Sequence, residues 1–448
     1  MTPVDPFPLL VAACAGVALV VVLVTLLKTP AFIALTVASA FVGISARMPL
    51  ADIPRAFQAG IGDTLGFVAM VIALGTVIGK LLAESGGAVV VSTALVRTLG
   101  ERRVDWALML SGFIIGLPVF FQVGLVLLAP VLFTVTRRTG TPLLRVVIPL
   151  LAGLSVSHGL VPPHPGPLAA VERLGADPGR TLFYAILVGF PVTILSGPVF
   201  GRLISRHVQI QAGPIAEQLS GPSTASRPPS LGVTLFTMLL PVLLMLLAAL
   251  AEGTMVDGPA RRVIEFAGTP LMAMLIATLL AMYTFGRACG FERTAILRFA
   301  EDSLGPIAGV LLVVGAGGGF GRVLTVAHVD TAIAQAMGGL QLSPLVQGWV
   351  IASLLRLSVG SATVAAVTAA SIMAPIAAAA PHANRELLVV SIGAGSLIAS
   401  HVSDGGFWLV KEYFNMTVPE TFKTWTILET IIAVAGLGGV LLLSLVVG

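Results

Sequence analysis

Charged side chains are scarce in this chain of 448 residues. Asp, Glu, Lys and Arg make up 10% of it, whereas soluble domains carry roughly 25%, so a soluble fold would lack the charge needed to cover its surface. A helix of about 20 apolar residues crosses a bilayer. Segments without any of these four residue types span 6–27, 106–136, 181–201, 231–251, 269–286, 303–321 and 357–384. We therefore expect an all-α polytopic membrane protein.

Other protein classes are excluded by what is missing. The two cysteines, Cys14 and Cys289, are too few for a disulfide framework or a thiolate metal site. The basic residues behind the net charge of +4 are scattered at the ends of apolar runs, which argues against nucleic-acid binding and suits loops that orient a membrane protein. The apolar runs are continuous, unlike the alternating segments of about 10 residues in a β-barrel. No metal and no cofactor are predicted.

The first apolar run resembles a signal peptide in length only. Segment 6–27 lacks a basic start, and another apolar run, 29–46, follows it at once. We therefore interpret 6–27 as the first spanning helix.

Glycine (49 residues) and proline (29 residues) are plentiful, and they interrupt the apolar runs. Segment 106–136 contains Gly116 and Pro118, segment 146–170 contains the proline-rich run 162–167, and five glycines fall within 315–321. Proline removes a backbone donor and clashes with the preceding turn, and non-helical backbone at membrane depth survives only when buried or lining a wet cavity. These features predict broken helices around a transport site; the alternative for the glycines is a helix-packing face.

The two halves of the chain resemble each other. Asp63 pairs with Asp302, Ser157-His158 with Ser400-His401, and Pro130 with Pro375, in the same order along the sequence. Between the halves lies the longest polar stretch, rich in Pro, Ser, Gly and Gln. We therefore predict a first membrane repeat over 1–204, a polar cytoplasmic linker over 205–230 and a second membrane repeat over 231–448. Internal repeats of this kind are typical of secondary transporters.

Loop charges indicate that the repeats are inverted. The linker together with its flank is basic, with Arg202, Arg206 and Arg227 against Glu217, and loop 286–302 carries three arginines against three acidic residues, whereas loops 47–63 and 252–265 are near neutral with two arginines each. The positive-inside rule then places the first two in the cytoplasm and the other two outside. Equivalent loops lie on opposite sides of the membrane, as inverted-topology repeats require.

The chemistry at the predicted interruptions suits an organic anion. Helix N-termini offer free N–H groups and a partial positive charge, and glycine lets that backbone approach a carboxylate. Hydroxyl groups bond a polyol without adding charge. The candidate substrate-binding residues are Ser157, His158, Gly317, Gly318, Gly319, Ser361, Thr363, Ser403 and Asp404.

Ionisable residues inside apolar segments are functional hypotheses by default. Asp404 is a candidate for proton coupling or substrate binding, the alternative being a structural carboxylate at a helix end. His158 and His401 titrate nearest physiological pH and are also proton-coupling candidates, unless they are hydrogen-bonded packing residues. His164, among prolines, is expected in a loop. Arg356 is expected to pair with a substrate carboxylate or to be a boundary residue whose charged head reaches the membrane surface.

Five motifs resemble signatures of the gluconate permease family of proton symporters. They are SHGLVPPHPGP (157–167), GLPVFFQVG (116–124), GAGGGFGRVL (315–324), GSATVA (360–365) and SHVSDGGFWLVKEYF (400–414). The resemblance covers nearly the whole chain. It implies membership of the larger ion-transporter superfamily, with two inverted repeats, each with a re-entrant hairpin, elevator-type movement and a homodimer. By resemblance, the substrate would be held around 157–167, 317–321, 360–363 and 400–406.

The expected function is therefore proton-coupled import of gluconate or a related sugar acid across the bacterial inner membrane. The expected partners are the organic acid, protons, membrane lipids and a second copy of the chain. Relatives that carry D-serine, glycerate or lactate are the alternative. An ion channel is disfavoured because neither rings of charge nor a carbonyl filter is evident. An enzyme is disfavoured because Gly153-x-Ser155 with His158 is not by itself a nucleophile–base pair, and no HExxH motif is present.

Overall fold

The apolar runs form helices, because only a helix satisfies its own backbone hydrogen bonds within one segment of a bilayer. The structure, a computed structural model, describes residues 6–210, 227–329, 332, 342–380, 383–401 and 404–447, and within them every regular element is helical. The helices of the first half are α1 (Pro6–Thr25), α2 (Ala31–Ser45), α3 (Asp52–Glu84), α4 (Gly87–Leu99), α5 (Val104–Gly116), α6 (Phe121–Thr139), α7 (Leu143–Leu160), α8 (Pro165–Leu174), α9 (Pro178–Ile194) and α10 (Phe200–Ile204).

The second half repeats this helical character. Its helices are α12 (Leu231–Thr254), α13 (Pro259–Gly268), α14 (Pro270–Ala281), α15 (Arg293–Asp302), α16 (Ala308–Val326), α18 (Pro344–Val359), α19 (Ala362–Ala379), α20 (Arg385–Gly395), α21 (Gly405–Tyr413), α22 (Val418–Thr421) and α23 (Ile427–Val447). A π-helical turn over Phe422–Thr426 joins α22 to α23.

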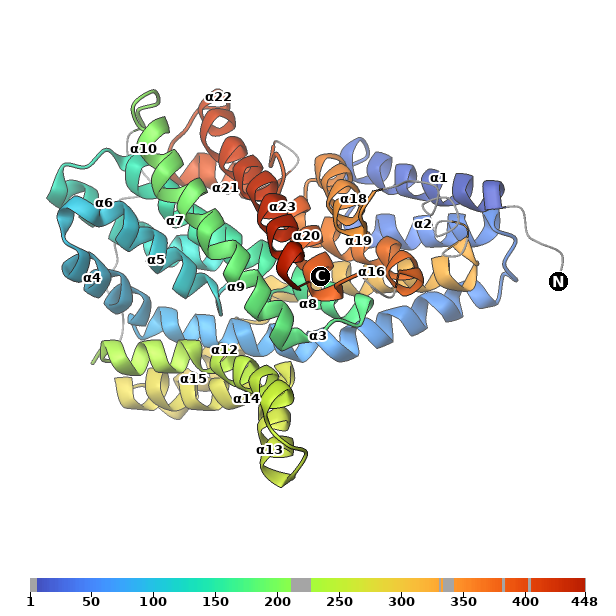
Figure 1. Ribbon diagram of the computed structural model, residues 1–448. Coiled ribbons are helices and arrows are strands. Elements are labelled where there is room, and N and C mark those ends of the chain that lie inside the picture. Colours follow the sequence, from blue (N-terminus) through green and yellow to red (C-terminus); the bar gives the residue numbers. More distant parts are fainter. Residues whose placement is uncertain are drawn as a thin grey trace.

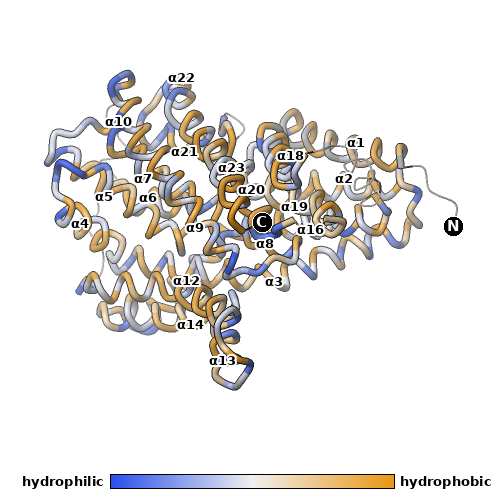
Figure 2. Tube along the Cα trace, viewed as in Figure 1, coloured by the Kyte–Doolittle hydropathy of each residue, from blue (hydrophilic) through white to orange (hydrophobic). Residues whose placement is uncertain are grey.

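Eight helical segments in the described part of the chain are long and apolar enough to cross a membrane. They are Asp52–Glu84, Leu143–Leu174, Pro178–Ile204, Leu231–Thr254, Pro270–Cys289, Ala308–Val326, Ala362–Ala379 and Val418–Val447. Apolar residues cover the helices along their lengths, and polar residues gather near several of their ends (Figure 2). The prediction of an all-α polytopic membrane protein is confirmed.

The long helix α3 organises the molecule. It has 33 residues, which corresponds to roughly 50 Å at 1.5 Å per residue. In Figure 1 it runs along the lower side of the main body, with α12 to α15 beneath it and the remaining helices above. It packs against α14 and α15 and also against α16 and α8. Helix α3 therefore connects the lower group of helices to the main body.

Two helical hairpins lie between the membrane-spanning helices. Helix α5 ends at Gly116, and α6 begins at Phe121 after four residues that include Pro118. With 13 residues, α5 is roughly 20 Å long, too short for a hydrocarbon core of about 30 Å. In the second half, α18 and α19 are joined through Gly360, whose φ of 77° favours glycine, and Ser361. The predicted break within 106–136 is confirmed.

Each hairpin is followed by a broken helix. Helix α7 ends at Leu160, and α8 begins at Pro165 beyond the Pro162-Pro163 pair. In the second half, α20 ends at Gly395 and α21 begins at Gly405. The series α5–α8 and α18–α21 thus have the same order, a hairpin and then a broken helix. The prediction of broken helices at matching places in the two halves is confirmed.

One predicted break is wrong. Residues 315–321 do not unwind but lie inside the continuous helix α16. Their glycines instead permit close packing: a Cβ on Gly318 would lie 2.6 Å from the Gly60 carbonyl oxygen of α3, and a Cβ on Gly317 would lie 2.5 Å from Val367 Cγ1 of α19. The alternative interpretation, a small-residue packing face, describes this segment.

We predict that Gly318→Ala destabilises the protein by about 1–3 kcal/mol, because an added methyl group at a packed contact forces neighbouring atoms to shift. The methyl would also meet the Thr64 hydroxyl, which accepts a hydrogen bond from Arg173. Thermal unfolding in detergent measures the effect. Gly66→Ala is the control, since nothing lies within 4 Å of its Cβ position. A Gly318→Ala protein as stable as the Gly66→Ala protein would contradict the packing role.

Candidate functional site

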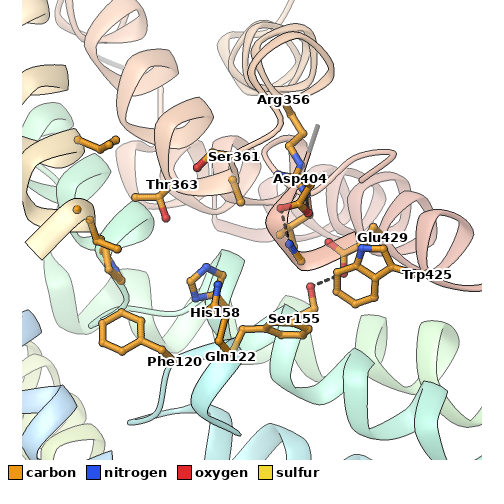
Figure 3. Close-up of a pocket in the computed structure, with 18 residues that line it drawn as sticks. Phe120, Gln122, Ser155, His158, Arg356, Ser361, Thr363, Asp404, Trp425 and Glu429 are labelled. Carbon is orange, nitrogen blue, oxygen red and sulfur yellow. Dashed lines mark hydrogen bonds and ion pairs between the residues drawn. The ribbon is translucent and has the colours of Figure 1, made fainter. Parts of the chain in front are cut away.

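A cavity of about 240 Å³ lies where the two hairpins and the two broken helices meet. Figure 3 shows side chains from these separate segments around one common space. The residues that line the cavity are Phe120, Phe121, Gln122, Ser155, His158, Pro165, Gly309, Val310, Val313, Arg356, Ser361, Ala362, Thr363, Leu397, Asp404, Gly406, Trp425 and Glu429. Every interruption of α5–α8 and α18–α21 therefore contributes to the same cavity.

Four helices begin at this cavity. Helices α6, α8, α19 and α21 start at Phe121, Pro165, Ala362 and Gly405, and each has a residue of its first turn in the lining. The N-terminus of a helix carries unpaired N–H groups and a partial positive charge. At α8 this donor is the Gly166 N–H, because Pro165 and Pro167 have none. The partial positive charges of four helix ends at one space favour a negatively charged occupant.

Arg356 is the guanidinium group in the lining. Its side chain is only 3% exposed, and its Nη2 donates a hydrogen bond to Asp404 Oδ2 at 2.5 Å. Its Nη1 donates to the carbonyl oxygen of Gly360 at 2.6 Å, which attaches the side chain to the tip of the α18–α19 hairpin. Its Nε is buried and has no hydrogen-bond partner among the described residues. Arg356 is thus a buried cation paired within the cavity rather than a boundary residue.

Asp404 is held by several donors. Besides the Arg356 contact, its Oδ2 accepts a hydrogen bond from the Ser400 hydroxyl. Its Oδ1 accepts from the backbone N–H of Gly406 at 2.9 Å, so Asp404 caps the N-terminus of α21. The carboxylate therefore caps a helix, as in the structural alternative, and also lies in the cavity lining, where a role in coupling or substrate binding is open to it.

Glu429 was missed by the sequence reasoning. It lies in α23, is 1% exposed and lines the cavity. The Ser155 hydroxyl of α7 donates to its Oε1 at 2.5 Å, as Figure 3 shows. A signal was available in the sequence, because Glu429 is the one ionisable residue within Ile427–Val447, and an ionisable residue inside an apolar span is a functional candidate.

Trp425 was also not predicted. It lies in the π-helical turn before α23 and is 3% exposed. Its indole Nε1 donates to the Ser400 hydroxyl at 2.7 Å, the same hydroxyl that donates to Asp404. π-Helical turns occur frequently at functional sites. Trp425 and Ser400 thus support the Asp404 carboxylate from the side of α23.

The two histidines of the first broken helix lie side by side. His158 lines the cavity, and its Nδ1 is buried with no hydrogen-bond partner among the described residues. Its ring lies 5.2 Å, centroid to centroid, from that of His164. His164 directly precedes α8, as expected for a loop residue, but it is buried, and its Nε2 donates to the Gly116 carbonyl oxygen at 2.6 Å. His164 thus joins the broken helix to the tip of the α5–α6 hairpin.

Of the other predicted residues, Ser361 and Thr363 line the cavity at the start of α19. Ser157 lies outside the lining, and its hydroxyl donates to the Phe113 carbonyl oxygen at 3.0 Å. His401 Nε2 donates to the Leu357 carbonyl oxygen at 2.9 Å and is not in the lining. Gly317, Gly318 and Gly319 contact α3 and α19 instead of the cavity. Ser403 lies outside the described residues.

The lining combines few charges with many neutral polar groups. The one guanidinium, Arg356, faces two carboxyl groups, Asp404 and Glu429, and the imidazole of His158. The neutral hydrogen-bonding groups are those of Gln122, Ser155, Ser361, Thr363 and Trp425. A small molecule with one negative charge and several hydroxyl groups matches this set of donors and acceptors.

Within the described residues, interrupted helices of a membrane protein meet at a cavity with charged and polar side chains, an arrangement typical of membrane transport proteins. Residues 7–446 match the family model described as GntP family permease. The chain belongs to this family and is a multi-pass protein of the bacterial inner membrane.

Curated relatives match nearly the whole chain. A gluconate permease of Pseudomonas aeruginosa is 48% identical, over 95% of this chain and 95% of its own length. The high-affinity gluconate transporter of Escherichia coli is 44% identical, over 98% of this chain and 100% of its own length. The D-serine transporter DsdX of Escherichia coli is 37% identical, over 96% and 97%.

A solved structure has a similar fold. The YdaH transporter of Alcanivorax borkumensis, whose crystal structure was described as having an unusual topology, superposes with a TM-score of 0.63. The match covers 89% of each chain at 19% sequence identity. At that identity the comparison concerns the fold alone.

Proposed function

We propose that this protein is a proton-coupled symporter that imports gluconate or a related sugar acid. One observation carries the proposal: four helix N-termini and the buried Arg356 converge on one cavity lined by neutral hydroxyl and amide groups. The names of the relatives with 44–48% identity support gluconate as the substrate. The alternative is another small carboxylate, in line with the more distant relative that transports D-serine.

The size of the cavity supports a small substrate. Its volume of about 240 Å³ is below the roughly 300–1,000 Å³ of pockets for drug-sized ligands. The substrate carboxylate binds Arg356 through charge-assisted hydrogen bonds. The hydroxyl groups of the sugar acid bond to Ser361, Thr363 and Gln122 at the two hairpin tips. The site therefore recognises the acid through one charge and several neutral contacts.

In this proposal, proton coupling arises because the Asp404 carboxylate and the substrate carboxylate compete for Arg356. The Asp404 carboxylate accepts a hydrogen bond from Nη2 of that guanidinium. Protonation neutralises Asp404 and weakens this ion pair, so that Arg356 becomes available to a substrate carboxylate. His158 is a second candidate for the coupling proton because it lines the cavity. His401 is a weaker one, since it lies outside the lining and its Nε2 donates to a backbone carbonyl.

The proposal also includes the domain organisation, the transport movement and the oligomeric state. The sequence predicts two repeats, 1–204 and 231–448, joined by a cytoplasmic linker over 205–230. The resemblance adds elevator-type movement and a homodimer. Within the linker, 211–226 lie outside the described residues. Matching hairpins and broken helices in the two halves support two repeats. Light scattering of the detergent-solubilised protein measures the oligomeric state, and a monomer would contradict the dimer.

We predict saturable uptake of labelled gluconate into proteoliposomes when the outside is more acidic than the inside. Unlabelled gluconate loaded inside should support counterflow, which a channel does not show, and the substrate should leave chemically unchanged, which excludes an enzyme. Competition by idonate, glycerate, lactate and D-serine ranks the substrates. Stronger competition by D-serine than by gluconate itself would contradict the sugar-acid assignment and favour the alternative.

A further inference from the structure

Glu429 has no role in the coupling scheme above, although it lies in the same cavity. Its side chain is buried, its partner is the Ser155 hydroxyl, and no Lys, Arg or His nitrogen of the described residues lies within 4.0 Å of its carboxyl oxygens. It lies inside the helical segment Val418–Val447, which is long and apolar enough to cross a membrane. A buried carboxylate without a cationic partner carries a large desolvation cost. Glu429 is therefore a carboxyl group suited to take up a proton.

The side-chain charges of the cavity lining also favour protonation of Glu429. The lining holds one guanidinium and two carboxyl groups, so with both carboxyls ionised and His158 neutral the cavity has an excess of negative charge and repels an anion. One proton makes the cavity neutral. Two protons leave Arg356 as the remaining charge, which matches a single substrate carboxylate. By side-chain charge alone, the cavity with its monovalent anion is therefore neutral when both carboxyls are protonated.

Among the described residues, three titratable or charged groups share the cavity with Glu429, and the others on the elements packed around it lie outside the lining. Helix α23 and its π-helical turn pack against α7, α9, α18, α20, α21, α22 and the π-helical turn Leu195–Val199. The titratable and charged groups on these elements are Arg145, His158, Arg180, Tyr184, Arg356, Arg385, Glu386, Lys411, Glu412, Tyr413, Glu420 and Lys423, with Asp404 at the start of α21. Of these, His158, Arg356 and Asp404 line the cavity together with Glu429.

We propose that Glu429 is a second proton-binding group of the cavity, so that two protons, one on Asp404 and one on Glu429, accompany each sugar-acid anion. The proposal rests on the proposed function. The proton binds the Glu429 carboxylate from the more acidic side and is released with the substrate on the other side. Ser155 and Glu429 lie on α7 and α23. Protonation of Glu429 therefore alters a hydrogen bond between the two halves of the chain.

The test is the steady-state accumulation of gluconate in proteoliposomes with the membrane potential clamped at zero and a pH difference of one unit. Each coupled proton contributes about a tenfold accumulation per pH unit, since one unit is worth 1.36 kcal/mol per proton. We expect Glu429→Gln to accumulate about tenfold less gluconate than the wild type while retaining counterflow. Glu412→Gln is the matched control, because that carboxylate is 59% exposed and lies outside the lining.

Wild-type accumulation by the Glu429→Gln protein would overturn the proposal. If the Glu429→Gln protein loses counterflow as well, a second variant, Ser155→Ala, tests the proposal. It keeps the Glu429 carboxyl group and removes the hydroxyl that donates a hydrogen bond to it. We expect half-maximal uptake by Ser155→Ala to lie about one to two pH units more alkaline than in the wild type, whatever its maximal rate, because the ionised carboxylate has lost its donor. An unchanged pH profile overturns the proposal. A wild-type protein that exchanges gluconate but never accumulates it in a pH gradient would refute proton coupling itself, a separate result.

Discussion

Arg356→Gln is expected to abolish measurable substrate binding and counterflow. The substitution removes the guanidinium from the cavity lining, together with its contacts to Asp404 and Gly360. Truncating one partner of a buried hydrogen-bonded charge pair costs roughly 2–5 kcal/mol, and 1.4 kcal/mol is a factor of ten. The substrate affinity should therefore fall by about 30- to 3,000-fold. Equilibrium binding of labelled gluconate to purified protein measures this change.

Two further variants separate binding from folding. Arg356→Gln also leaves the Asp404 carboxylate without its cation, which is destabilising. The double variant Arg356→Gln/Asp404→Asn removes both charges and should recover stability without recovering binding. Arg55→Gln is the matched control, because the Arg55 side chain is 77% exposed and its ion pair with Asp52 spans 3.5 Å, an arrangement worth about 0–1 kcal/mol. Near wild-type affinity in the Arg356→Gln protein would rule out Arg356 as the anion-binding group.

Asp404→Asn should remove one of the two coupled protons while sparing exchange. The amide is neutral, so it imitates the protonated carboxyl and no longer competes as an anion for Arg356. With the membrane potential clamped, the accumulation ratio should fall about tenfold per unit of pH difference, and counterflow should persist. Combined with Glu429→Gln, the substitution should remove proton-driven accumulation altogether. Gluconate uptake into proteoliposomes at fixed internal and external pH measures both effects.

A control is needed because Asp404 also caps α21. Asparagine is itself a favourable N-cap residue, so the helix end should persist in the variant. Asp257→Asn is the matched control, since that side chain is 71% exposed and lies outside the cavity. Full accumulation by the Asp404→Asn protein would exclude Asp404 as a coupling residue and would shift the proposal to His158 and Glu429.

The positions of the broken helices were largely predictable because proline acts locally. The proline-rich run 162–167 and the Gly116–Pro118 segment interrupt helices in the structure as the sequence indicates. Glycine is less informative. The five glycines of 315–321 suggested a break, yet they lie in the continuous helix α16. Glycine permits both an unwound backbone and close helix packing, and only the approach of α3 and α19 decides between the two.

The candidate site was predictable in part. His158, Ser361, Thr363 and Asp404 line the cavity, because polar residues beside a helix interruption tend to face the space that the interruption opens. Ser157 is the immediate neighbour of His158, but it points to the other side of α7 and bonds to the hairpin backbone. The sequence left it open whether Arg356 is a boundary residue or a binding residue, because its burial depends on α18 packing among its neighbours.

The sequence by itself determined the class of this protein: the scarcity of charge and the length of the apolar runs require a helical membrane protein, and proline dictates where several helices stop. Only the tertiary structure decided which interruptions share a cavity, because that depends on contacts between distant segments. Arg356 meets Asp404 across 48 positions and Ser155 meets Glu429 across 274. Such pairs are set by how whole helices pack, which local sequence patterns do not specify.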